Sequence, residues 1–384
     1  MEKKRVLVII PDRFEKSTGG MGANSAPLFD ALSSEYDFYI AGFPLAGTNP
    51  PRFAKEYREV SSAFTEIKQG VISTIAAQAR YLSAAIRFPK PDLIYAFDWS
   101  IYHAAVEAAD YFGVPLVARM CLSPILLSMQ GYTFGLNLAD PLQKALHNAL
   151  CEMEIRGLRR ADRIVQVSRG YAKLYEKVSD FSDKTRLVIN GIDLDAWRRE
   201  LSPFEFPGTR ARKIVFLGRF AEMKGIVPLA KARVPDDTDL IFIGDMEASD
   251  RVCANAIQKK VENEDNVHYV GPLYGEDKIR ALQSADALIV PSYHEPFGGV
   301  GLEGLAAGCT VLSSRAGGLA DYLTDETSIY CGTTPAEIED AYAKLRALPS
   351  EARAAMCEAG FQTCRELTID SATRQLRSVF EEVS

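Results

Sequence analysis

The sequence predicts an α/β protein of two domains, each built on a parallel, doubly wound sheet. Short apolar runs alternate with longer helical patterns along the chain. With 384 residues, the chain is long enough for two domains with their own cores. The periodicity breaks at 198–212, where two prolines, a glycine and many charges are typical of a linker. We therefore expect a first domain over residues 1–200 and a second over residues 210–364.

In the first half, strand-like and helix-like segments alternate from the start. The expected strands cover residues 5–10, 37–41, 92–95, 115–118, 163–167 and 186–189. The expected helices cover residues 23–34, 71–87, 141–161 and 169–178. The last of these strands leads into Asn190-Gly191, a dipeptide typical of a turn, which we interpret as structural.

The second half restarts after the candidate linker and repeats the alternation. The expected strands cover residues 213–217, 239–243, 267–270, 287–290 and 309–312. A helical pattern ends at Gly308, another begins at Gly317, and the last amphipathic helices cover residues 335–348, 351–360 and 370–383. Neither half contains a repeat of solenoid period or a low-complexity tract.

Composition excludes several classes of protein. The net charge of −7 argues against nucleic-acid binding, which normally requires a basic excess. The first apolar run, residues 6–10, is too short for a signal peptide or a membrane span. The seven cysteines are scattered without a C-x-x-C pair, so we expect reduced thiols in a cytoplasmic protein and no metal site.

The segment 287–318 organises the second half as strand, glycine-rich turn, helix and strand. The turn is expected at the carboxyl edge of the sheet, where open α/β folds bind ligands. Gly298 and Gly299 allow close approach of the backbone, and the following helix N-terminus favours phosphate. Glu295 and Glu303, with seven residues between them, can accept hydrogen bonds from sugar and ribose hydroxyls. From spacing alone, an ordinary turn with solvated glutamates stays an alternative.

Two cations follow the first strand of the second half. Arg219 and Lys224 lie five residues apart around a turn, so a guanidinium and an ammonium can converge on one diphosphate. Without further context, two such cations are most often solvated.

A second glycine-rich loop follows the strand expected at residues 5–10. Strand, loop and helix together again form a candidate anion site. A plain mobile turn is an equal alternative. The glycines concerned are Gly19, Gly20 and Gly22.

The stretch HEPFGGVGLEGLAAG resembles the E-x7-E signature of retaining glycosyltransferases of the GT-B fold. It is most similar to the glycogen and starch synthase branch of the family 4/5 group. The resemblance implies that Glu295 contacts the donor sugar and that Glu303 binds the ribose. It implies that the backbone of Phe297, Gly298 and Gly299, with Val300 after it, holds the sugar and phosphate.

Further segments match the same family. Gly218 and Arg219 to Lys224-Gly225 resemble its G-R-x(n)-K-G element, whose cations bind the donor diphosphate. The glycine loop at residues 19–22 resembles the loop near the donor phosphates. By resemblance, Gly244 and Leu273 lie in the segments that contact the nucleotide.

The first half departs from the family pattern. Histidines that the family often places after two strands are absent, and Phe97 and Arg119 stand roughly at those positions. Asp98 and Arg119 are therefore the candidates on the acceptor side. These departures argue against a standard glycogen synthase.

The resemblance implies two Rossmann-like domains facing a cleft, with the final helix, residues 365–384, returning to the first domain. It implies transfer of a hexose, with glucose as the first candidate, from a nucleotide-diphosphate sugar to a glycan or small-molecule acceptor without a metal, as in polysaccharide biosynthesis. The alternative for the donor is GDP-mannose, in which case the chain is a mannosyltransferase. A non-catalytic glycan- or partner-binding module and a nucleotide-sugar epimerase are the alternatives from other classes.

The segment 122–138 is unusually apolar for a stretch with a proline, two glycines and an asparagine. The commonest explanation is a loop packed on its own domain. An acceptor-pocket wall, a dimer contact or a lid that touches a membrane surface are the alternatives. No sequence feature predicts an oligomeric state.

Overall fold

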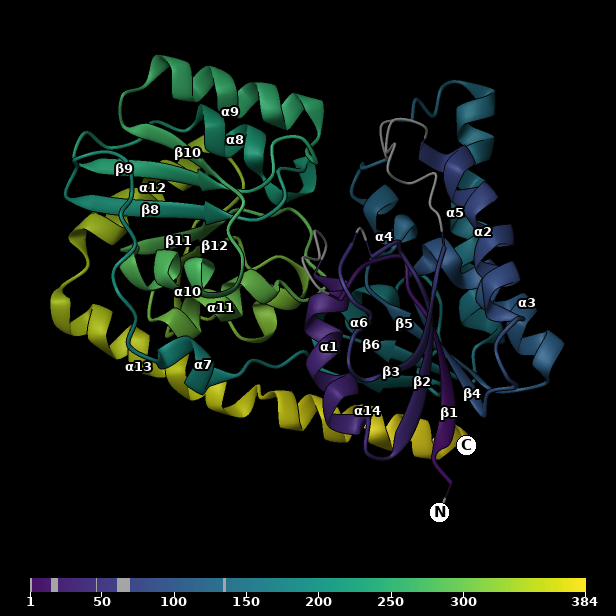
Figure 1. The fold of residues 1–384 in the computed structure, drawn as a ribbon. Helices are drawn as coiled ribbons and strands as arrows, with labels where there is room; N and C mark the ends of the chain where they lie inside the picture. Colours follow the sequence, from purple (N-terminus) through teal and green to yellow (C-terminus); the bar gives the residue numbers. More distant parts are fainter. Residues whose placement is uncertain (1, 15–19, 46, 61–69, 134–135) are drawn as a thin grey trace. The chain divides into compact units, whose positions relative to one another are not determined.

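The computed structural model describes residues 2–14, 20–45, 47–60, 70–133 and 136–384 (Figure 1). The chain divides into two compact units, Met1–Ile189 with Ile369–Ser384 as unit 1 and Asn190–Thr368 as unit 2. Each unit contains one parallel sheet with helices around it, which confirms the predicted fold class. Among the described residues, no helix combines the length and apolarity that crossing a membrane requires.

The sheet of unit 1 has the strand order β3-β2-β1-β4-β5-β6-β7. Its strands are β1 (Lys4–Ile9), β2 (Tyr36–Gly42), β3 (Ala54–Glu59), β4 (Leu93–Phe97), β5 (Leu116–Met120), β6 (Arg163–Gln166) and β7 (Thr185–Leu187). Its helices are α1 (Met21–Leu32), α2 (Gly70–Ala85), α3 (Tyr102–Phe112), α4 (Pro124–Met129), α5 (Pro141–Arg160), α6 (Arg169–Tyr175) and α14 (Ile369–Val383). Strands β4 and β5 are buried at every residue, as strands covered on both faces must be.

The sheet of unit 2 has the strand order β10-β9-β8-β11-β12-β13. Its strands are β8 (Arg212–Leu217), β9 (Thr238–Ile243), β10 (Val267–Gly271), β11 (Ala287–Val290), β12 (Thr310–Ser313) and β13 (Ser328–Tyr330). Its helices are α7 (Leu194–Arg198), α8 (Ile226–Lys231), α9 (Arg251–Asn263), α10 (Gly275–Ser284), α11 (Gly299–Ala307), α12 (Pro335–Ala347) and α13 (Ser350–Glu366).

Each sheet has one topological switch point. In unit 1 the chain builds β1, β2 and β3 towards one edge and then starts again at β4, next to β1. In unit 2 it builds β8, β9 and β10 and then starts again at β11, next to β8. Loops that leave the carboxyl ends of two such strands turn away from each other and leave a crevice, where ligands bind in open α/β sheets.

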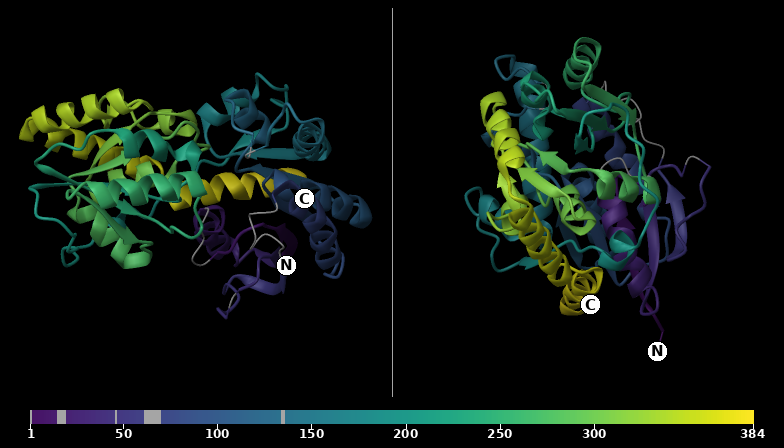
Figure 2. Two further views of the ribbon diagram at one scale, coloured as in Figure 1. Left: turned by 90° about the horizontal axis from the view of Figure 1, so that it is seen from above. Right: turned by 90° about the vertical axis from the view of Figure 1, so that its left-hand side faces the viewer.

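The C-terminal helix α14 belongs to unit 1. It packs beside α1 and is the yellow helix that ends at the C-terminus in Figures 1 and 2. Phe380 is fully buried, with its ring 5.5 Å from that of Tyr36 and 5.2 Å from that of Tyr95. At its outer face, Arg377 donates two hydrogen bonds to Glu35.

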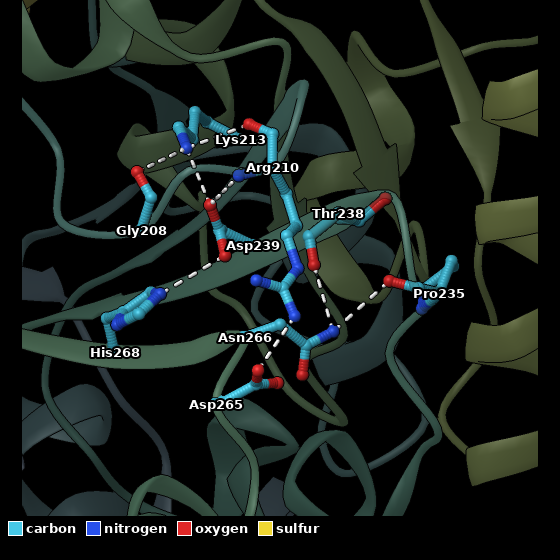
Figure 3. A network of polar contacts seen from close by, with 9 residues as sticks. All are labelled: Gly208, Arg210, Lys213, Pro235, Thr238, Asp239, Asp265, Asn266 and His268. Atoms are coloured by element: carbon cyan, nitrogen blue, oxygen red, sulfur yellow. Dashed lines mark hydrogen bonds and ion pairs between the residues drawn. The ribbon is translucent and has the colours of Figure 1, made fainter.

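The segment expected to be a linker is attached to unit 2, so the first boundary lies earlier in the chain, between Ile189 and Asn190. A polar network at the amino ends of β8, β9 and β10 explains this attachment (Figure 3). Asp239, buried at the start of β9, accepts hydrogen bonds from the backbone N–H of Arg210 and from Lys213 Nζ at 2.6 Å. His268 Nε2 lies 3.1 Å from its other oxygen.

The apolar segment 122–138 contains α4, outside the predicted elements. Leu126 and Leu127 are buried, and Leu126 belongs to the core of unit 1, as a packed loop would require. Met129 and Leu138 are exposed. Phe134 and Gly135 lie outside the described residues.

Candidate functional site

The switch point of unit 2 brings two predicted loops together. One follows β8 and carries Gly218 to Gly225, and the other follows β11 and carries Pro291 to Gly298. The N–H of Tyr293 donates to the carbonyl oxygen of Met223 at 2.8 Å, which fixes the loops against each other. Gly225 has φ +72°, and a side chain there would overlap the carbonyl of Pro291.

Lys224 and Glu295 meet where these loops touch. Lys224 Nζ lies 2.5 Å from Glu295 Oε1, and Ser292 Oγ donates to the same oxygen at 3.0 Å. Glu295 is 3% exposed, whereas the side chain of Lys224 keeps 24% exposure. The carboxylate is therefore held in one orientation, and the ammonium can still reach an anion from solvent.

His294 precedes this carboxylate and is almost completely buried. Burial lowers the pKa of His294 to about 4, although the neighbouring Glu295 acts in the opposite direction. The imidazole is therefore neutral near pH 7, and the positive charge beside Glu295 comes from Lys224.

Arg219 follows Gly218 directly after β8, and its side chain is exposed. The N–H of Gly218 donates to the carbonyl of Ile243 at the end of the neighbouring strand, at 3.0 Å. The guanidinium is thus accessible on the same loop as Lys224, as the predicted diphosphate contact requires.

Helix α11 begins at this edge without a side-chain cap. Gly298, its N-cap, has φ +82°, and a Cβ there would overlap Leu319. Phe297 is buried with its ring 5.3 Å from that of Tyr322, whose hydroxyl donates to the carbonyl of Gly298. The turn is therefore held by packing, and no side-chain cap competes with a ligand for the first amides of the helix, among which is that of Val300.

Glu303 lies about one turn into α11. Its Oε1 accepts a hydrogen bond from Lys278 Nζ at 2.7 Å, and both side chains are about three-quarters buried. Lys278 comes from α10 and was not predicted as a site residue, because nothing in its local sequence distinguishes it from a solvated lysine.

The predicted nucleotide contacts lie at the carboxyl ends of β9 and β10. The N–H of Gly244 donates to the carbonyl of Gly271 at 3.1 Å, and Tyr269 Oη donates to the carbonyl of Gly244 at 3.1 Å. A Cβ on Gly244 would overlap the carbonyl of Gly218. Leu273, two residues beyond β10, is half-buried. Unit 2 thus gathers its predicted site residues along one edge of its sheet.

In unit 1, the predicted glycine loop is described only in part, because Gly19 lies outside the described residues. Gly20 has φ +81° and caps α1. The N–H of Gly22 donates to Asp12 Oδ2 at 3.1 Å, and a Cβ on Gly22 would overlap the backbone of Arg13. Asp12 follows β1, so this loop lies at the switch point of unit 1.

Asp98 lies on the other side of that switch point, directly after β4. Its φ is +69°, which is rare for a residue with a side chain, and its carboxylate accepts from the N–H of Ser100 at 3.1 Å. Burial raises the pKa of Asp98 to about 7, more than the hydrogen bonds from Ser100 lower it.

Arg119 differs from a surface ligand-binding residue because only 2% of it is exposed. Its guanidinium donates to Tyr95 Oη at 3.1 Å and lies 5.4 Å from the ring centre of Phe97. The structure therefore places it in the aromatic layer between the sheet and α14. Its acceptor contact stays a prediction.

The described part of the chain contains no group of three or more His, Cys, Asp or Glu side chains that could hold a metal ion. Its cysteines are all free thiols.

The chain is similar to known proteins in both sequence and fold. Residues 198–363 match the family described as Glycosyl transferases group 1. The chain is 25% identical to glycogen synthase from Mycobacterium tuberculosis (strain ATCC 25618 / H37Rv), over 91% of this chain and 87% of that protein.

Two solved structures have the same fold. Sucrose-phosphate synthase from Thermosynechococcus elongatus superposes with a TM-score of 0.80 at 19% identity, over 99% of both chains. Anabaena HepE in complex with UDP-glucose superposes with a TM-score of 0.70 at 15% identity, over 98% of this chain and 99% of that chain. The chain therefore has the GT-B fold, and its residues 198–363 match the model of the glycosyl transferases group 1 family.

Proposed function

We propose that this chain is a retaining hexosyltransferase that moves a hexose, with glucose as the first candidate, from a nucleotide-diphosphate sugar to a hydroxyl acceptor. The observation that carries the proposal is the pairing of Lys224 with the buried Glu295 at the switch point of unit 2, beside the uncapped start of α11. A cation, a sugar-orienting carboxylate and free backbone amides at one place suit a substrate that combines a hexose with a diphosphate.

Breaking the bond between the anomeric carbon and the phosphate oxygen leaves positive character on the sugar and negative charge on the diphosphate. Arg219, Lys224 and the amides that start α11 stabilise the diphosphate charge, because the loops that carry them are held against each other before the reaction. Glu295 accepts hydrogen bonds from the sugar hydroxyls and orients the ring.

In the proposed reaction, the acceptor oxygen bonds to the anomeric carbon on the face that the diphosphate leaves. The acceptor proton passes to the departing phosphate oxygen, so the chain itself supplies no nucleophile. By the same family resemblance, we propose that no metal takes part and that turnover persists in EDTA.

Glucose is the first candidate because the sequence around Glu295 most resembles that of the glycogen and starch synthase branch. The similarity to a glycogen synthase and to HepE, solved with UDP-glucose, supports the same choice. A glycan or a small hydroxyl compound is the proposed acceptor, with Asp98 on the acceptor side of unit 1.

A thermal-shift screen against UDP, ADP, GDP, their glucose conjugates and GDP-mannose tests the donor. A ligand that binds only the folded state raises the melting temperature, and more so as it binds more tightly. We expect one nucleotide to stabilise the wild type and to lose its effect in Arg219→Ala and Glu303→Ala. Lys259→Met, an exposed lysine on α9, is the matched control.

Turnover of that donor, with and without candidate acceptors, then separates the classes of function. Transfer with a product of the same anomeric configuration, read by NMR, supports the proposal. Conversion of the donor sugar without an acceptor indicates an epimerase. Binding without turnover indicates a non-catalytic module, and no stabilisation by any nucleotide overturns the transferase proposal.

A further inference from the structure

We propose that Lys278 is a positioning residue of the nucleotide site, which holds Glu303 so that one carboxylate oxygen stays available to the ribose. This inference rests on the proposed function, because it needs a ribonucleotide as the ligand of Glu303. Neither the motif nor the local sequence of α10 assigns Lys278 any role.

The ion pair crosses from one helix to the next. Lys278 Nζ on α10 lies 2.7 Å from Glu303 Oε1 on α11, and the two helices pack against each other. The two side chains are 25% and 22% exposed. An ion pair at this depth is screened less than a surface pair, so its geometry is better defined.

Lys278 is itself held from a third helix. Its ammonium lies 5.3 Å from the ring centre of Trp197 on α7, within the range of a cation–π interaction. Trp197 is 8% exposed, and its carbonyl accepts a hydrogen bond from Gln283 Nε2 at 2.7 Å. The ammonium therefore has two fixed partners, the ring of Trp197 and one oxygen of Glu303.

Two consequences follow for a bound nucleotide. The ion pair occupies Oε1 of Glu303 and restrains its rotamer, so Oε2 can accept a hydrogen bond from a ribose hydroxyl without first being ordered. The ammonium also compensates the charge of Glu303, which would otherwise repel the diphosphate at the nearby start of α11. Ribose recognition therefore depends on Lys278 through Glu303.

The test measures how much the ribose hydroxyls contribute to binding. Isothermal titration calorimetry compares UDP, ADP or GDP, whichever stabilises the wild type, with its 2′,3′-dideoxy counterpart. The variants are Lys278→Met, which keeps the stem of the side chain, Lys278→Arg, which keeps the charge, and Glu303→Gln. Lys259→Met is again the matched control, and Lys278→Gln replaces Lys278→Met if that variant does not fold.

We expect the wild type to bind the ribonucleotide about tenfold more tightly than the dideoxynucleotide, as for one hydrogen bond to a charged group. Lys278→Met should lose most of this preference, Lys278→Arg should retain part of it, and Lys259→Met should retain all of it. Combined with Glu303→Gln, Lys278→Met should cause no further loss of preference. In turnover, Lys278→Met should raise the KM for the donor and leave kcat nearly unchanged.

An unchanged ribose preference in Lys278→Met overturns the inference. Equal weakening of both nucleotides also overturns it, because Lys278 would then act on the phosphates or on general stability. In both cases the proposed function survives, since the wild type still binds the nucleotide. Absence of nucleotide binding in the wild type defeats the proposed function itself, and this inference with it.

Discussion

At the scale of single residues, the ion pair between Lys224 and Glu295 is the central feature of unit 2. A carboxylate that is 3% exposed loses most of its hydration, and Lys224 with Ser292 replaces it. The same lysine is the proposed diphosphate ligand. A bound donor therefore shares the ammonium with Glu295, which couples stability of the loop pair to ligand binding.

Substitutions of this pair should separate stability from catalysis. Lys224→Met leaves a buried carboxylate without its cation, so we expect a loss of up to about 3 kcal/mol in unfolding free energy. Adding Glu295→Gln to Lys224→Met should restore part of that loss, because the uncompensated charge is gone. Both variants should lower kcat/KM by at least about 100-fold. Urea unfolding and donor turnover measure the two effects, and a double variant no more stable than Lys224→Met contradicts the charge argument.

Gly225 provides a second test at the same loops. Gly225→Ala must adopt an unfavourable φ and also overlaps the carbonyl of Pro291, so we expect a loss of about 2–4 kcal/mol and weaker donor binding. Gly275→Ala is the matched control, because Gly275 also has positive φ, +53°, but no atom lies within 4 Å of its Cβ position. Urea unfolding should show a clearly smaller loss for the control. Equal losses would mean that φ alone, and not the approach of the two loops, requires glycine.

At the scale of elements, α14 completes unit 1 although it follows all of unit 2 in the sequence. We expect apolar burial to stabilise the packing of α14 on the rest of unit 1 more than its ion pair does. Phe380→Ala should cost about 3–5 kcal/mol in unfolding free energy, because a fully buried ring is removed from an aromatic cluster.

Arg377→Ala is the control for this prediction, since it removes a partly exposed ion pair with Glu35 and should cost only about 0–1 kcal/mol. Urea unfolding followed by circular dichroism measures both losses. A larger loss from Arg377→Ala than from Phe380→Ala would show that the salt bridge holds the helix.

At the scale of the whole molecule, buried carboxyl groups of unit 1 should make folding stability depend on pH. Burial raises the pKa of Asp98 to about 7 and that of Glu154, which is fully buried on α5, to about 8. Between the unfolded and folded pKa values, the folded state binds more protons than the unfolded chain. Stability therefore falls as the pH rises through this window.

We expect the unfolding free energy of the wild type to decrease from pH 6.5 to pH 8.5. His294, with its lowered pKa, contributes a change of opposite sign only below about pH 6.5. Burial raises the pKa of thiols such as Cys121 and Cys364, which therefore add a decrease of the same sign towards pH 8.5, so the carboxyl contribution is read as the difference between the wild type and Glu154→Gln. Glu154→Gln should flatten the dependence, because an amide cannot ionise. Asp239→Asn should leave the dependence unchanged in this range. Burial raises the pKa of Asp239, but hydrogen bonds from Lys213 and His268 lower it by more, so the pKa lies below its usual value. The carboxylate of Asp239 therefore affects stability only at acid pH. Urea unfolding at each pH measures the slope, and an unchanged slope in Glu154→Gln would contradict the assignment.

Much of the fold could be predicted because buried parallel strands and amphipathic helices have different periodicities. Strand β3 was not predicted, because Ala54–Glu59 is a polar segment at the sheet edge and carries no apolar run. The linker boundary was placed too late, because the charged and proline-rich sequence of 198–212 resembles a free connection. Arg210 in this segment donates a hydrogen bond to Asp239, which lies 29 residues later in the chain.

The class of fold and the motif residues of unit 2 can be inferred from the sequence alone. Local patterns encode these features, including the spacing of Glu295 and Glu303 and the glycines of tight turns. Which of these residues meet depends on the tertiary structure. Strand order, rather than distance along the sequence, places β8 beside β11 and therefore brings Lys224 into contact with Glu295. The tertiary structure likewise buried Arg119 among aromatic rings and placed Lys278 against Glu303. Both outcomes depend on packing between elements, which no local pattern carries.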